Sequence, residues 1–106
     1  MNFTSSYVKT IKQVEALLVE KLNIDLGNCF HLTMLLNKKN CKKAIGENAT
    51  LLRAYESLYL QYFYLEWTDN YLSPESMAED YNMTEDQVCD LINNGRSVHN
   101  KILAAL

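Results

Sequence analysis

Apolar residues recur at helical spacing in the N-terminal part of the chain. Between residues 8 and 22 they lie three or four positions apart: Val8, Ile11, Val14, Leu18 and Leu22. This spacing puts apolar side chains on one face of a helix and leaves the lysines between them on the other. We therefore predict an amphipathic helix over residues 6–24, with hydroxyl groups at residues 4–6 as candidate caps and a turn ending at Gly27 and Asn28.

Two shorter segments follow this helix. Residues 29–37, CFHLTMLLN, are mostly apolar and are interpreted as a second, well-buried helix, although periodicity alone also permits a strand. Residues 38–43, KKNCKK, are polar and basic. We expect them to cap the second helix and to open a short turn to Gly46.

The central segment predicts the helix that organises the fold. It starts at Asn48 or Thr50, runs to about Trp67 and is apolar or aromatic almost all round over residues 58–67. Such a helix is either central to a core or shared with another subunit, so we expect a homodimer. The expected core is centred on five of its residues: Leu52, Tyr55, Leu58, Tyr62 and Leu65.

The C-terminal part carries local signals for two more helices. Ser73 and Pro74 form a start signal, a hydroxyl cap followed by proline at the first helical position. Asn82 lies where a turn needs a positive φ. Thr84 and Gln87 match a capping box for the next helix. That helix buries Val88, Leu91 and Ile92, and we expect it to end at residues 94–95, Asn-Gly.

The stretch from Pro74 to Asn93 resembles the helix-turn-helix family. Apolar groups lie at the expected inner positions, Met77, Tyr81, Met83, Val88 and Leu91, and small Ala78 lies where the helices would cross. Asn82 replaces the usual glycine of the turn. The resemblance covers about twenty residues and implies a helix-turn-helix-like unit over residues 73–106.

Composition favours the same fold class. A chain of 106 residues is expected to form one helical domain, residues 1–106, and its single proline and three glycines favour long helices. We therefore predict an all-α protein, a small bundle of four to six helices. No apolar run reaches the roughly 18 residues of a membrane span, and the first residues lack a secretion signal, so we expect a cytoplasmic protein without a membrane partner.

Charge is distributed unevenly along the sequence. Residues 1–53 hold eight Lys or Arg against four Asp or Glu, whereas residues 54–95 hold nine acids and no Lys or Arg. Outward positions of the second helix of the unit include Glu85, Asp86 and Asp90, which would face the phosphates of DNA. Acids in a first helical turn also favour the helix dipole. A scaffold without a role for these acids and an acidic protein-binding surface both remain open.

The first functional hypothesis is a non-enzymatic interaction or regulatory protein. It would present an acidic, Tyr-containing helical face to a basic protein, which could itself bind nucleic acid. Tyr71 lies nearby in the sequence. The predicted partner-binding residues are Glu79, Asp80, Tyr81, Glu85, Asp86 and Asp90.

The alternative hypothesis is a dimeric helix-turn-helix transcriptional regulator that binds DNA. Two of its candidate residues would read bases, and two, together with the lysines of residues 38–43, would contact phosphates. These DNA-binding candidates are Gln87 and Asn93 for bases, and Arg96 and Lys101 for phosphates.

Catalytic, metal and cofactor chemistry finds little support in the sequence. His31 and His99 are far apart, and no phosphate-binding glycine loop or metal-ligand spacing is present. Three widely spaced cysteines, Cys29, Cys41 and Cys89, fit reduced thiols better than a disulfide framework. We expect no enzyme, no cofactor and no metal. In overall style the chain resembles small accessory and regulatory proteins of bacterial phages and plasmids.

Overall fold

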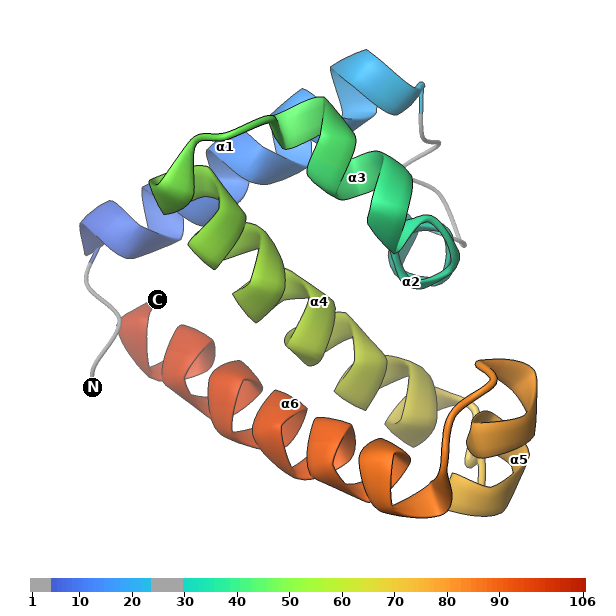
Figure 1. The fold of residues 1–106 in the computed structure, drawn as a ribbon. Helices are drawn as coiled ribbons and strands as arrows, with labels where there is room; N and C mark the ends of the chain where they lie inside the picture. The colour runs from blue at the N-terminus through green and yellow to red at the C-terminus, as the bar shows by residue number, and fades with distance from the viewer. Residues whose placement is uncertain (1–4, 24–29) are drawn as a thin grey trace.

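The computed structural model describes residues 5–23 and 30–106. Within these ranges the chain forms helices and turns and no strand, which confirms the predicted all-α class (Figure 1). The predicted turn at Gly27 and Asn28 and the thiol of Cys29 lie outside the described residues, as does the side chain of His31. The helices are α1 (Ser5–Leu22), α2 (Phe30–Leu36), α3 (Lys38–Ile45), α4 (Ala49–Asp69), α5 (Pro74–Asp80) and α6 (Glu85–Ala105).

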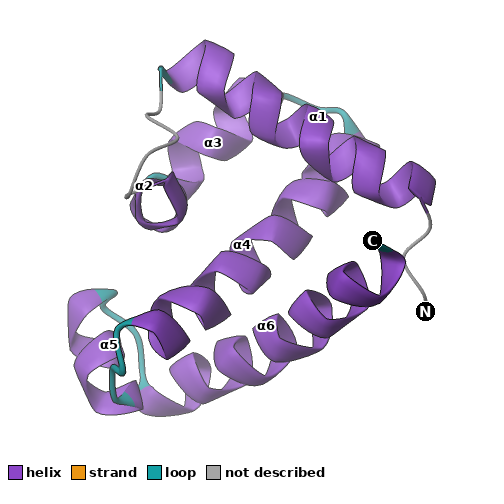
Figure 2. Cartoon of the chain, turned by 180° about the vertical axis from the view of Figure 1, so that it is seen from behind, coloured by secondary structure: helices purple, strands orange, loops and turns teal. Residues whose placement is uncertain are grey.

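Helix α4 occupies the centre of the arrangement. Helix α6 runs beside it in the opposite direction, α2 and α3 lie on the other side, and α5 closes the far end (Figures 1 and 2). Helix α1 contacts the N-terminal part of this assembly through α3 and α4. Helices of the same chain therefore pack against α4 on several sides. The apolar sequence of α4 is thus no longer a reason to expect a homodimer. The homodimer itself stays a prediction.

The core is built around one aromatic stripe of α4. Tyr55, Leu58, Tyr59 and Phe63 are buried, and successive rings of the stripe lie 6.3–6.4 Å apart. Leu58, a predicted centre, is 1% exposed. The predicted centre is wrong for Leu52, Tyr62 and Leu65, which are only half-buried.

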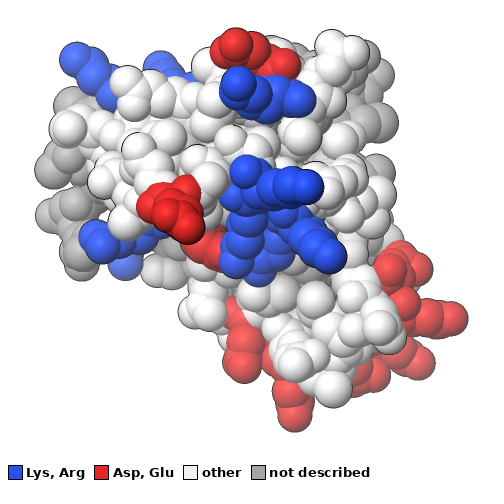
Figure 3. All heavy atoms as spheres, turned by 45° about the horizontal axis from the view of Figure 1, so that its top comes forward, with Lys and Arg blue, Asp and Glu red and all other residues white. Residues whose placement is uncertain are grey.

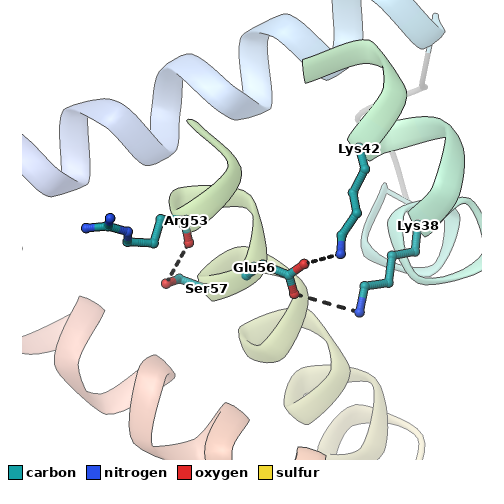
Figure 4. Close-up of polar contacts among 5 residues, drawn as sticks. All are labelled: Lys38, Lys42, Arg53, Glu56 and Ser57. Atoms are coloured by element: carbon teal, nitrogen blue, oxygen red, sulfur yellow. Dashed lines mark hydrogen bonds and ion pairs between the residues drawn. The ribbon is translucent and has the colours of Figure 1, made fainter. Parts of the chain in front are cut away.

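Residues 38–45 form helix α3, which corrects the predicted turn. Cys41 and Ile45 lie four residues apart and are both buried, so one face of this polar segment belongs to the core. The lysines occupy its outer faces. Glu56 of α4 pairs with two of them, at 2.6 Å from Lys42 Nζ and 3.7 Å from Lys38 Nζ (Figure 4). Tertiary contacts therefore make this segment helical despite its low apolar content.

Helix α2 is confirmed as a helix, but the side chains described in it, those of residues 33–36, are not all buried. Met34 and Leu35 are buried, whereas Leu36 is 64% exposed. The prediction that the whole segment is well buried is therefore wrong at its C-terminal end. Leu36 lies where α2 gives way to the turn before α3, and its side chain faces outward.

Gly95 does not end α6, as the sequence analysis predicted, but lies in its middle. A Cβ atom at this position would overlap the carbonyl oxygen of Leu60 and lie 2.7 Å from Cβ of Tyr64. The backbones of α4 and α6 are therefore closer here than any side chain would allow. Glycine serves this helix crossing, and α6 continues to Ala105.

A partly buried carboxylate joins α1 to α4. The hydroxyl of Tyr62 donates a hydrogen bond to Oε2 of Glu15 over 3.1 Å. Burial raises the pKa of Glu15, and the hydrogen bond from Tyr62 and the charge of Lys12 only partly oppose this effect. The ionised carboxylate is therefore less well solvated in the folded protein than in the unfolded chain.

We expect Gly95→Ala to lower the free energy of unfolding by about 1–3 kcal/mol, because the added methyl group must push α6 away from the backbone of α4. Urea unfolding followed by circular dichroism measures this effect. Asn94→Ala is the matched control: Asn94 is exposed and alanine is the better helix former, so this variant should be at least as stable as the unmodified protein. Equal stability of the two variants would contradict the close crossing.

We expect Glu15→Gln to stabilise the protein at pH 7 and to lose this advantage in acid. The folded pKa of Glu15 lies above the ordinary 4.5. Protonated Glu15 therefore makes its full contribution to the free energy of unfolding below pH 4.5. This contribution is lost as the pH rises through the folded pKa. The glutamine stays neutral and its amide oxygen still accepts from Tyr62. Unfolding midpoints at several pH values test this, with exposed Glu20→Gln on the same helix as the control; a pH-independent difference would refute it.

Candidate functional site

The corner between α5 and α6 is held by local hydrogen bonds. Ser73 Oγ accepts from the backbone N–H of Ser76 at the start of α5. Thr84 Oγ1 accepts from the N–H of Gln87, and Oε1 of Gln87 accepts from the N–H of Thr84, at 3.1 and 3.0 Å. Asn82 has a φ of 54°. The predicted start at Ser73, the left-handed turn residue and the capping box are therefore confirmed.

Five carboxylates surround this corner, and we call them the acidic face. All of them are exposed, at the end of α5 and in the first two turns of α6. Figure 3 shows acidic side chains gathered at the end of the molecule where α5 lies, and basic side chains gathered over α3. The fold thus keeps the two charged regions of the sequence apart in space. The acidic face consists of Glu79, Asp80, Glu85, Asp86 and Asp90.

Tyr81, predicted to bind a partner, mainly joins α5 to α4. Its ring is half-buried and lies 5.5 Å from the ring of Phe63. Burial is the main reason that the pKa of Tyr81 is raised to about 12, and the nearby charges of Glu66 and Asp80 act in the same direction. The phenol therefore stays protonated at neutral pH. Tyr71, by contrast, is 95% exposed.

An open groove of about 470 Å³ lies on the outer side of the corner. Its apolar part comes from Met83 and Leu91, which are both half-buried. Asp90 of the acidic face lines it together with Asn82 and Gln87. The groove was not predicted from the sequence. The apolar period places Met83 and Leu91 in the interior, and it does not show which part of a core residue remains accessible.

The residues predicted to bind DNA do not share one surface. The Gln87 side chain is used in the capping box. With about 3.6 residues per turn, Arg96 lies on the opposite side of α6 from Gln87, and its guanidinium carbon is 5.8 Å from the centre of the Tyr64 ring. Asn93 and Lys101 are exposed. Asn93 shares its helix face with Asp90, three residues before it, so the fold places a carboxylate beside the one free base-reading candidate.

Other groups with chemical potential are dispersed. Among residues 5–23 and 30–106, no three His, Cys, Asp or Glu side chains lie close enough to hold a metal ion. His99 is half-buried, with Nδ1 3.3 Å from Gln61 Nε2 and its ring 5.5 Å from that of Tyr64. Cys41 is buried and Cys89 exposed, both as free thiols. No helix in the described part of the chain is long and apolar enough to cross a membrane.

Comparison with known proteins gives no significant match to a protein family, a curated protein or a solved structure. Membership of the helix-turn-helix family and an origin in a phage or plasmid stay predictions.

We expect Thr84→Ala to lower the free energy of unfolding by about 1 kcal/mol, because it removes the acceptor for the N–H of Gln87 at the start of α6. Thermal and urea unfolding measure the change. Thr68→Ala, an exposed threonine on α4, is the matched control and should change stability by no more than about 0.5 kcal/mol. If the two variants are equally stable, the capping box contributes nothing to the corner.

Proposed function

We propose that this protein is a non-enzymatic interaction protein whose acidic face docks on a basic protein partner, such as a nucleic-acid-binding protein. The observation that carries the proposal is the exposure of all five carboxylates of the acidic face around one hydrogen-bonded corner. No Lys or Arg occurs in residues 54–95 to neutralise them from within the same stretch of chain.

The charge arrangement favours association with a cation-rich surface. Exposed charges of one sign attract a partner of the other sign over about a Debye length and orient it during encounter. The lysines of α3, two of which pair with Glu56, lie away from the acidic face (Figure 3). The acidic face therefore presents a field of one sign to an approaching partner.

A cytoplasmic regulatory role is part of the same proposal. In this role the protein would occupy a surface that its target uses for another purpose, and it would need no catalytic group. An acidic surface is suited to cover the nucleic-acid-binding surface of a target, because both the acids and a nucleic acid are recognised by the same cations.

DNA binding is the second candidate function, and the arrangement of α5, turn and α6 is the observation in its favour. Exposed Asn93 and Lys101 remain available on α6. Against it, Gln87 is used in the capping box, and Asp86 and Asp90 lie on the side of α6 from which Asn93 would approach a base. Each carboxylate brought near phosphate weakens the non-specific attraction on which DNA binding depends.

We expect the protein to bind a lysine-rich peptide at low salt and to leave a duplex DNA of the same length unbound. Fluorescence anisotropy at about 0.05 and 0.5 M salt should show peptide affinity falling with ionic strength. The variant Glu85→Ser, Asp86→Asn, Asp90→Asn should bind the peptide at least about fivefold more weakly, because half or more of the attraction comes from these charges.

The control variant removes three acids elsewhere: Glu20→Gln, Glu47→Gln and Asp69→Asn, all exposed. It has the same net charge as the variant of the acidic face, so a general effect of charge would weaken both equally and would contradict a docking face. Sequence-selective duplex binding by the unmodified protein, lost in Asn93→Ala, would establish the DNA-binding alternative instead.

A further inference from the structure

The groove at the corner of α5 and α6 is open to solvent and large enough to admit an apolar side chain. Met83, in the turn before α6, and Leu91, on α6, provide its accessible apolar surface. The volume of about 470 Å³ exceeds that of a single large side chain. Methionine is flexible and polarisable, so it adapts to apolar groups of different shape.

Local structure holds the groove open. The N–H of Met83 donates to the carbonyl of Ala78 over 3.0 Å, which fixes the chain as it leaves α5. The positive φ of Asn82 turns the backbone, and the capping box sets the first turn of α6. Because these bonds are formed within the corner itself, an occupant would not have to order it first.

The rim of the groove is acidic. Asp90 lines the groove directly, and Asp86 lies one helical turn before it on the same side of α6. An apolar side chain that enters it would therefore have its flanking residues next to carboxylates.

We infer that this groove seats a Leu, Met or Phe side chain from a segment of the partner that carries Lys or Arg on either side. The inference rests on the proposed function and specifies its partner as a basic amphipathic segment. Apolar burial in the groove supplies affinity, and the flanking cations meet the acidic rim. The aliphatic stems of Lys or Arg can cover the remaining apolar surface while their charged ends reach the carboxylates.

The chain's own basic helix does not fit the groove. Helix α3 carries four lysines, but its apolar residues Cys41 and Ile45 are buried against the core and cannot act as anchors. The C-terminal end of α6 is the competing occupant from a second copy, since Leu103 and Leu106 are 54% and 76% exposed there and Lys101 is close in sequence. It offers one lysine to five acids, which makes it a poorer electrostatic complement.

Two synthetic peptides of equal length and charge test the inference. One repeats Lys and Leu at helical spacing, and the other has serine in place of every leucine. Titration into isotope-labelled protein should give about tenfold tighter binding of the Lys/Leu peptide, as burial of one leucine side chain implies. Nuclear Overhauser contacts should join the peptide's leucine methyl groups to the methyl groups of Met83 and Leu91 in the unmodified protein.

Matched variants locate the contact. Met83→Ser should remove most of the preference for the Lys/Leu peptide, whereas Leu103→Ser should keep it. Asp90→Asn should weaken both peptides more than Glu75→Gln does, because both variants lose one charge but only Asp90 lines the groove. The contacts to methyl groups in the unmodified protein decide the question if Met83→Ser fails to fold.

The outcomes separate this inference from the proposed function. If both peptides bind equally and substitution of the acidic face weakens both, the groove does not bind an apolar side chain. The acidic docking face would still be supported. Failure of both peptides to bind at low salt would overturn both. The Met83 and Leu91 signals could instead shift with protein concentration alone, and Leu103→Ser could abolish these shifts. A second copy of the chain would then occupy the groove, and a basic segment of a partner would not.

Discussion

The close crossing of α4 and α6 at Gly95 is the contact on which the rest of the structure depends. Because Gly95 has no side chain, α6 can lie directly on the backbone of Leu60 and beside Tyr64. The two longest helices, of 21 residues each, then run side by side in opposite directions. Helix α5 closes the end of this pair, and α1, α2 and α3 cover the remaining sides of α4. A side chain at the crossing would push the two helices apart.

The same crossing decides where the charges go. It aligns α6 so that Val88 and Ile92 are buried while Asp86 and Asp90 are exposed. The corner that leads into α6 is held by hydrogen bonds formed within it, and the groove of Met83 and Leu91 lies beside it. Apolar surface and negative charge are therefore combined at one place. At the other side of the molecule, α3 presents lysines and contributes Cys41 and Ile45 to the core.

The sequence by itself determined the features whose causes lie within a few residues. Ser73, Asn82 and the pair Thr84 and Gln87 each act on their own turn of backbone, so their roles were predicted correctly. The aromatic segment of α4 was predicted as the central helix because nearly every side of it is apolar. The exposure of the acidic face followed from the period of the apolar residues around it.

Only the tertiary structure decided the features that depend on a distant part of the chain. The local sequence around Gly95 is compatible with a helix end and with a helix crossing. The close approach to Leu60, 35 residues earlier in the chain, decides between the two. The lysine-rich segment is helical because Cys41 and Ile45 find a core to enter. The groove exists because neighbouring helices cover only part of Met83 and Leu91. Periodicity records which face of a helix is apolar, whereas the packing of other helices determines how much of that face remains accessible.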